Sequence, residues 1–175
     1  KLSPYDEVVK AVAEEYGWDW RLLSSLIFQE SKFEMDKESW AGAFGIMQFM
    51  PQTAPIYGVT PESSAEEQIR GGMKKLNKNF EDWKNIKDSI QRIKFTLATY
   101  NAGLGHVQDA QRLAEKHGLN PLIWDGNVGK MMLELMKPKY YQDDVVRFGY
   151  IRGIETFNYV NEIFLRYNEY KNAFP

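Results

Sequence analysis

Apolar residues along the chain recur mostly every three or four positions, which is the period of an amphipathic α-helix. The strict alternation that marks a half-buried strand is hard to find. Ser and Asp residues stand before several of these apolar runs, where they can cap a helix, and Gly or Pro follows most of them. We therefore predict an all-α protein. The predicted helices cover residues 4–16, 20–33, 64–80, 86–100, 107–116, 128–136 and 144–170, with a helical turn near Pro51 and a break near Gly149 or Gly153.

The chain has no internal repeat, no low-complexity tract and no flexible linker. Its 175 residues are enough to bury a sizeable core. We therefore predict one compact domain over residues 1–175.

Composition narrows the possible functions. The 22 Lys and Arg residues against 24 Asp and Glu residues give a net charge of −2, unlike the basic surplus of nucleic-acid-binding proteins. There is no Cys and there are only two His residues, so we expect no metal site, and the absence of phosphate loops and nucleotide fingerprints implies no cofactor. No apolar run approaches the roughly 20 residues of a membrane helix, and the first residues lack a signal-peptide pattern. We expect a soluble chain, which is compatible with an excised or processed module.

One carboxylate stands where the packing pattern asks for an apolar side chain. Glu30 shares a helix face with Leu26, Ile27 and Phe33 of the predicted second helix. A carboxylate on such a stripe is either paired with a cation or desolvated at a cleft wall, and desolvation alone raises its pKa toward neutrality. A Glu in that state can act as a general acid. The alternative is a helix-terminal Glu whose carboxylate reaches solvent, which is the commoner situation for a lone Glu.

The residues after Glu30 predict a tight loop that can receive a ligand. Gly42, Ala43 and Gly45 let a backbone pass close to another chain or to a ligand. The Ser39 hydroxyl and the Gln48 amide are uncharged groups suited to sugar hydroxyl and N-acetyl groups.

The run "ESKFEMDKESWAGAFGIMQFMPQTA", residues 30–54, closely resembles the catalytic signature of the family 1 lytic transglycosylases. Two further family motifs follow in order, "ATYNAG" at 98–103 and "ETFNYV" at 155–160, so that all three motifs lie within residues 28–160. The C-terminal run is most similar to the catalytic module of the membrane-bound, F-type members. The chain departs from the pattern at Ile46 and Met35, and it lacks the Ile-Pro often found before the third motif. The resemblance implies a lysozyme-like helical fold with a substrate cleft.

The resemblance also implies an activity, the cleavage of the β-1,4 bond between N-acetylmuramic acid and N-acetylglucosamine in peptidoglycan without water as nucleophile. Glu30 would protonate the bridging oxygen and then, as a base, take the proton of the muramic sugar's C6 hydroxyl, giving a 1,6-anhydro product. One carboxylate then serves both steps, whereas ordinary glycosidases need two. The loop from Ser39 to Met50 contains no carboxylate, and the acids Glu34, Asp36 and Glu38 are expected to be solvated.

Matching the family motifs position by position implies six residues that contact the substrate. Four of them also have a structural interpretation, because Ser39 can form a turn, methionine is a common core filler, Tyr100 lies on the apolar stripe of its helix and Tyr159 can serve for packing. Without family support the five tryptophans, Trp40 included, are assigned to the core, and His106 and His117 are expected to be solvated or capping. The implied substrate-binding residues are Ser39, Met47, Gln48, Tyr100, Asn101 and Tyr159.

Three other functions stay open at this stage. One is a peptidoglycan-binding module with little or no catalysis, one is a hydrolytic lysozyme of related fold, and one is a helical interaction domain without a ligand. The resemblance further implies glycan strands as the partner, no nucleic acid, a monomer and a ligand-binding domain upstream in the full protein. It places the protein on the periplasmic side of the cell envelope, associated with the outer membrane through a part not in this chain.

Overall fold

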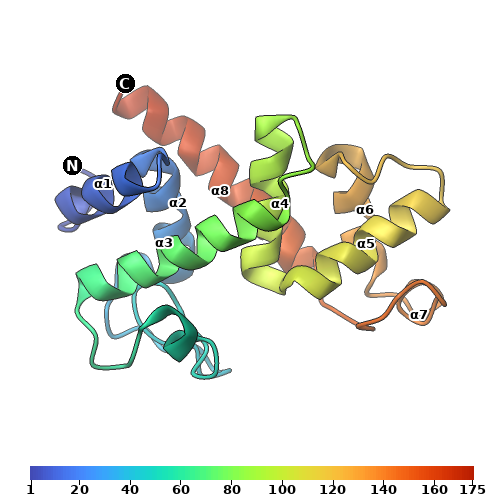
Figure 1. Cartoon of the computed structure of the whole chain (residues 1–175), viewed down its shortest axis with the longest axis horizontal. Coiled ribbons are helices and arrows are strands. Elements are labelled where there is room, and N and C mark those ends of the chain that lie inside the picture. Colours follow the sequence, from blue (N-terminus) through green and yellow to red (C-terminus); the bar gives the residue numbers. More distant parts are fainter. The chain divides into compact units, whose positions relative to one another are not determined.

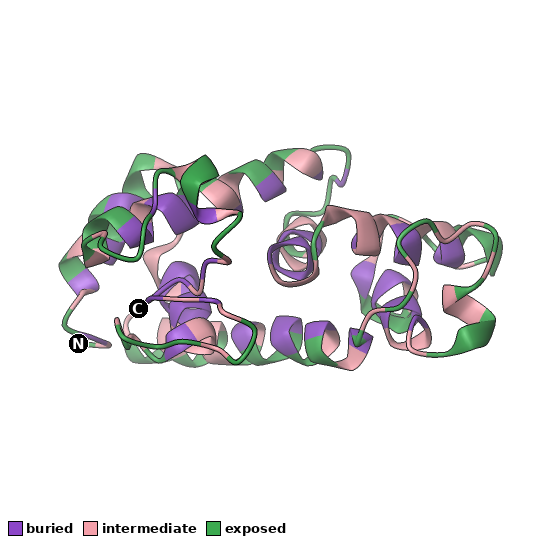
Figure 2. Ribbon diagram, turned by 90° about the horizontal axis from the view of Figure 1, so that it is seen from below, coloured by how far each residue is buried: buried purple, intermediate pink, exposed green.

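The computed structural model describes all 175 residues and is helical, as predicted. Its extended pairings are limited to two isolated bridges, Glu38 with Phe44 and Phe44 with Phe49. Along α1 and α3 buried and exposed residues alternate with helical spacing, whereas α2 has no exposed residue and α7 has no buried one (Figure 2). The elements, labelled in Figure 1 where there is room, are α1 (Asp6–Glu15), α2 (Trp20–Ser31), η1 (Ala54–Tyr57), α3 (Ala65–Asp82), α4 (Ser89–Ala102), α5 (Leu104–Lys116), η2 (Trp124–Val128), α6 (Gly129–Glu134), α7 (Pro138–Tyr141) and α8 (Gly153–Ala173).

The chain falls into two compact units, each described by itself. Unit 1 comprises Lys1–Asn77 and Glu162–Pro175, and unit 2 comprises Lys78–Asn161. The boundary lies inside α3 and inside α8, so each of these helices contributes residues to both units. A single catalytic domain over residues 1–175 stays a prediction.

In unit 1, α1 and α2 are in contact, and both carry fully buried apolar residues, among them Val9 and Val12 on α1 and Leu26 on α2. The helix α1 begins at Asp6 rather than at Pro4, because the Asp6 carboxylate accepts the backbone N–H groups of Leu2 (2.8 Å) and Ser3 (2.9 Å). The backbone N–H groups of Leu2 and Ser3 are satisfied by these bonds, which hold the two residues outside the helix.

The start of α2 confirms the predicted cap. The Asp19 carboxylate accepts the backbone N–H of Arg21 at 2.9 Å and also two bonds from the Arg21 guanidinium. On α8 the Tyr167 hydroxyl donates to the same carboxylate at 2.8 Å. Burial raises the pKa of Asp19, but the bonds from Arg21 and Tyr167 outweigh it and leave the pKa below its usual value. Burial and the bond to Asp19 raise the pKa of Tyr167 to about 12.

The helix α2 ends at Ser31, one residue after Glu30. Lys32 and Phe33 have φ values of 54° and 64°, so the chain leaves the helix in the left-handed region. The prediction that Phe33 shares a helix face with Glu30 is therefore wrong. The start of α3 follows the sequence pattern, since Ser64 and Glu67 form a reciprocal capping box with bonds of 3.1 and 3.0 Å.

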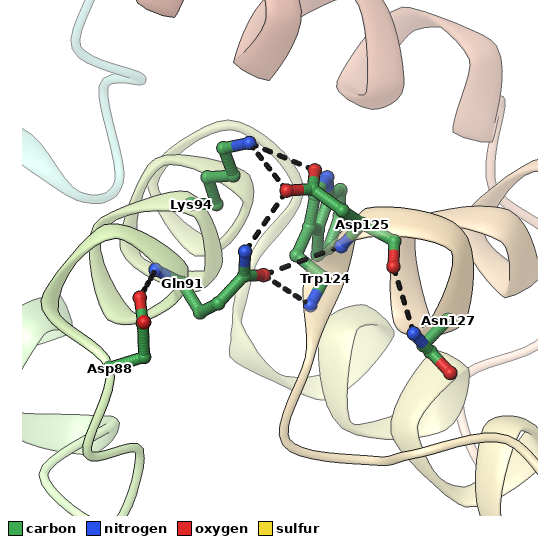
Figure 3. Close-up of polar contacts among 6 residues, drawn as sticks. All are labelled: Asp88, Gln91, Lys94, Trp124, Asp125 and Asn127. Atoms are coloured by element: carbon green, nitrogen blue, oxygen red, sulfur yellow. Dashed lines mark hydrogen bonds and ion pairs between the residues drawn. The ribbon is translucent and has the colours of Figure 1, made fainter.

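In unit 2 the helix α4 begins at Ser89, three residues later than the pattern of apolar residues suggested, because the Asp88 carboxylate caps it by accepting the N–H of Gln91 at 2.9 Å. The side chain of Gln91 then holds the turn at η2 (Figure 3): its oxygen accepts the N–H of Trp124 at 2.7 Å and its nitrogen donates to Asp125 at 3.0 Å. Lys94 donates to both oxygens of Asp125. Trp124, which these bonds position, is 1% exposed and meets Phe95 edge-on at 5.7 Å.

The predicted last helix is wrong over residues 144–152. These residues form a turn, a bend and irregular segments, and α8 begins only at Gly153. The fully buried carboxylate of Asp109 on α5 accepts the N–H groups of Arg147 and Phe148, each at 2.8 Å, so these donors are not available to a helix. Asp109 also forms an ion pair with Arg112. Gly149 then turns the chain with a φ of +72°.

Candidate active site

Glu30 lies in the last turn of α2 and is half-buried. Its neighbour Ser31 is buried, and the Ser31 hydroxyl donates to the carbonyl oxygen of Ile46 at 2.7 Å. The N–H of Ile46 donates in turn to the side-chain oxygen of Gln68 on α3 at 3.0 Å. The peptide groups on both sides of Ile46 are therefore fixed, which ties the family signature to the end of the helix that carries Glu30.

We call residues 37–49 the signature loop. Phe44 and Phe49 exchange backbone hydrogen bonds of 2.9 and 3.0 Å, and the N–H of Gly45 donates to the carbonyl of Lys37 at 2.9 Å. Gly45 has a φ of +79°, and a Cβ there would lie 2.1 Å from the side-chain oxygen of Gln68. Only glycine satisfies both conditions, so the close backbone approach predicted for this loop is confirmed at Gly45.

Gln48 adopts a φ of +51°, which is uncommon for a residue with a side chain. Its amide nitrogen donates to the carbonyls of Lys37 at 3.0 Å and Gly45 at 2.8 Å, so these bonds hold the turn. Both amide hydrogens are thereby used within the loop, and the amide oxygen is the part of Gln48 that a ligand can still engage.

Ser39 is half-buried at the base of a tight turn. Its hydroxyl oxygen accepts the N–H of Ala43 at 2.9 Å, and the backbones of the same two residues bond at 2.8 Å. Ser39 thus forms the turn, as its structural interpretation proposed, while its hydroxyl hydrogen still has a direction in which to donate.

Met47 is fully buried and packs against Gly72 of α3, where a Cβ would lie 2.1 Å from the Met47 methyl group. Its side chain thus fastens the signature loop to α3. A contact between Met47 and substrate stays a prediction.

Lys75 on α3 is a further candidate site residue, which the sequence analysis did not name. It follows Gln68 and Gly72 on one helix face, at spacings of four and three residues, and both of those residues contact the signature loop. Burial lowers the pKa of Lys75, and the negative charge of Glu30 opposes that shift. From the sequence, Glu30 is expected either to pair with a cation or to be desolvated at a cleft wall. The positive charge of Lys75 favours the first of these, a Glu30 with a cation nearby. In the sequence Lys75 stands beside Lys74 and close to Lys78, so its residue type alone does not distinguish it from them.

The other predicted site residues belong to unit 2. Tyr100 at the end of α4 and Tyr159 on α8 are both 5% exposed. The side-chain oxygen of Asn101 accepts a bond from the Thr156 hydroxyl at 2.7 Å, which joins the second family motif to the third. Substrate contacts for these residues stay predictions.

Asn101 and Thr156 also border a small open pocket of about 180 Å³. His106 lines this pocket and is half-buried, with its Nδ1 atom buried and without a hydrogen-bond partner, so it is less exposed to solvent than expected from the sequence. Burial lowers the pKa of His106 against the opposing charge of Asp109, which favours a neutral imidazole. The pocket is lined by Asn101, Ala102, His106, Ile151, Arg152, Glu155 and Thr156.

Two observations bear on other kinds of site. No group of three or more His, Asp or Glu side chains is placed to hold a metal ion. No helix combines the length and the apolar character that crossing a membrane requires.

Trp40, assigned to the core from the sequence, is fully exposed, so that assignment is wrong.

Residues 7–123 match the family model described as the transglycosylase SLT domain, and the chain belongs to this family. The resemblance seen in the motifs is thereby confirmed. Among curated relatives, the chain is 34% identical over 168 residues to membrane-bound lytic murein transglycosylase F of Desulfosudis oleivorans, covering 96% of this chain and 36% of that protein. It is 40% identical over 166 residues to the protein of the same name from Shewanella pealeana, covering 93% and 33%. The chain thus spans about a third of the length of these relatives.

Two solved structures share the fold. An inactive mutant of the lytic transglycosylase Slt of Pseudomonas aeruginosa matches with a TM-score of 0.60 at 22% identity, over 97% of this chain and 25% of that one. The 70 kDa soluble lytic transglycosylase of Escherichia coli matches with a TM-score of 0.63 at 23% identity, over 99% and 25%. The predicted fold class, an all-α lytic transglycosylase fold, is confirmed.

Proposed function

We propose that this chain is the catalytic part of a peptidoglycan lytic transglycosylase. It cleaves the β-1,4 bond between N-acetylmuramic acid and N-acetylglucosamine and leaves a 1,6-anhydro end, with Glu30 as general acid and then as general base. The relatives are named lytic murein transglycosylases, and the bond, the product and the role of Glu30 are inferred from the motif resemblance.

The observation that carries the proposal is the double attachment of Ile46. Ser31, next to Glu30, bonds the carbonyl of Ile46, and Gln68 bonds its N–H. A catalytic acid needs a fixed position relative to the groups that hold the substrate. This arrangement supplies it, because the loop with Ser39 and Gln48 cannot shift against the end of α2 without breaking a buried hydrogen bond.

The charges around Glu30 support the two-step chemistry. When Glu30 gives its proton to the bridging oxygen, the ammonium of Lys75 stabilises the carboxylate that results. That carboxylate then removes the proton of the C6 hydroxyl, whose oxygen closes on C1. The acids of the adjacent segment, Glu34, Asp36 and Glu38, are all exposed, which favours a mechanism with one carboxylate over one that needs a second at the reacting carbon.

The place of action and the partners follow from the same comparison. The relatives are named membrane-bound. We propose that glycan strands are the partner of this chain, and that the full protein acts in the cell envelope, on the periplasmic side, held at the outer membrane by a part outside this chain. An upstream ligand-binding domain and a monomeric state stay predictions.

The test is a digest of purified peptidoglycan with the wild-type chain and a Glu30→Gln variant, with products resolved by mass spectrometry. The variant keeps the size of the side chain and removes the transferable proton. A Glu34→Gln variant is the matched control, since Glu34 is an exposed acid four residues away. We expect anhydromuropeptides from the wild type and from Glu34→Gln, and none from Glu30→Gln.

Other outcomes would identify the alternatives. Products one water heavier, with reducing ends, would mean a hydrolytic lysozyme. Sedimentation with peptidoglycan but no products from any of the proteins would mean a binding module.

A further inference from the structure

Trp40 differs from the other tryptophans in its surroundings. Its side chain is 100% exposed, whereas Trp83 and Trp124 are 3% and 1% exposed. Trp18 and Trp20 are half-buried. An indole left wholly in water forgoes one of the largest hydrophobic contributions that a side chain can make. Its exposure therefore calls for a role other than stabilising the fold.

The turn that presents Trp40 is held in place without any contribution from the indole. Backbone bonds join Ser39 to Ala43 at 2.8 Å and Gly42 to Ser39 at 3.0 Å, and the Ser39 hydroxyl accepts a third bond. Below this turn the bridge between Glu38 and Phe44 closes the hairpin. The turn is thus fixed before any ligand binds, which lowers the entropy lost on binding.

The neighbours of Trp40 leave its ring faces open. Ala41 and Gly42 are small, and a Cβ placed on Gly42 would meet nothing within 4 Å. Ser39, directly before Trp40, has a hydroxyl hydrogen that can still donate. A flat apolar face beside a hydroxyl donor suits a pyranose ring, which has C–H groups on its faces and hydroxyl groups around its edge.

The charges near Trp40 favour a sugar over a membrane surface as the partner of the indole. The exposed acids Glu34, Asp36 and Glu38 lie in the segment leading to the turn, with Lys37 among them. Anionic lipid headgroups attract basic segments, so this acidic segment disfavours a lipid surface. An uncharged sugar meets no such repulsion.

We propose that Trp40 is a substrate-binding residue, whose indole stacks on one sugar ring of a glycan strand bound alongside Ser39. This inference rests on the proposed function, because it takes the glycan strand to be the ligand. It adds a contact that the family motifs do not assign, since Trp40 occupies a position between the motif serine and the motif glycine.

The test compares the affinity for a β-1,4-linked N-acetylglucosamine oligomer with the KM for soluble peptidoglycan strands. The variants are Trp40→Ala, Trp40→Tyr and the matched control Ile56→Ala, which removes another exposed apolar side chain of unit 1 (73% exposed). We expect Trp40→Ala to raise Kd and KM by about fivefold to tenfold, in the range of one aromatic contact, with kcat little changed. Trp40→Tyr should recover most of the affinity, and Ile56→Ala should bind like the wild type.

The design separates this inference from the proposed function. A wild type that cleaves peptidoglycan while Trp40→Ala keeps the same Kd and KM would overturn the stacking role and leave the enzyme standing. A wild type that binds through Trp40 and yields no product would overturn the activity and keep the stacking role. Loss of binding to anionic lipid vesicles in Trp40→Ala, with oligomer affinity unchanged, would overturn the sugar in favour of a membrane.

Discussion

Replacing Gly153 by alanine tests the packing that starts α8. A Cβ at this position would lie 1.6 Å from the carbonyl oxygen of Met132 and 3.2 Å from the backbone nitrogen of Leu133. Both neighbours are backbone atoms, so no side-chain rotation can make room. The start of α8 or the helix α6 has to move, and the bonds that hold the preceding turn move with it.

The size of the effect follows from two opposing contributions. Overpacking against a rigid neighbour costs about 3 kcal/mol, and exchanging glycine for alanine at a helix start returns at most about 1 kcal/mol. The net loss of about 2 kcal/mol corresponds to a melting temperature lower by about 4–8 °C for a chain of this size. Far-UV circular dichroism during heating measures it directly.

The matched control is Gly105→Ala on α5. A Cβ there would lie 2.6 Å from a ring carbon of Phe148, but that side chain is 59% exposed and can rotate into solvent. The control should therefore melt close to the wild type. If Gly153→Ala melted with the wild type as well, the contact with Met132 would not limit the residue at this position, and the reasoning would be refuted.

Three further changes test other parts of the structure. Asp109→Ala removes the acceptor of two backbone N–H groups and leaves a guanidinium without its ion pair, so urea unfolding should show a loss of about 3–5 kcal/mol; an unchanged midpoint would contradict this. Lys75→Met removes a positive charge near Glu30 and favours the protonated carboxyl, so the alkaline limb of kcat/KM should move to higher pH; a lower rate with an unmoved limb would mean that Lys75 only packs. Tyr167 has its pKa raised to about 12 in the folded chain, mainly by burial, so the stability it contributes is complete below its unfolded pKa and is lost as pH rises through the folded value. Tyr167→Phe should therefore flatten the fall of stability between about pH 10 and about pH 12 in urea titrations, and an equally steep fall would exclude Tyr167 as its cause.

The parts of the fold that could be predicted from the sequence are those whose causes are local. Asp19 and Ser64 cap backbone groups within four residues of themselves, and an Asp or Ser before an apolar run predicts such a cap from the residue type. The error over residues 144–152 has a distant cause, since Asp109 binds N–H groups 38 and 39 residues further along the chain. The spacing of apolar residues along the chain cannot predict a hydrogen bond between residues so far apart in the sequence.

The candidate site divides in the same way. The motifs could supply Glu30, Ser39 and Gln48, because a family signature records which residue types stand at which spacing. The motifs could not show which hydrogen bonds each polar group forms. An example is the Gln48 amide nitrogen, which donates two bonds to carbonyls of its own loop. Hydrogen bonds of this kind depend on the turn, and the turn depends on a φ of +51° at a residue that is not glycine.

Glu30 and Lys75 are two charged residues that each stand beside buried residues, and the charge of one accounts for the position of the other. Each is a charged residue beside buried neighbours on its own helix, and each taken alone reads as a side chain that reaches solvent. Considered together, the two charges have opposite signs and act on one another within unit 1. When a charged residue on an apolar stripe is paired rather than solvated, its partner can be sought among the polar residues on the buried faces of other elements. In this chain one polar residue among the buried residues of α3 is Lys75, and its positive charge acts on the proposed acid.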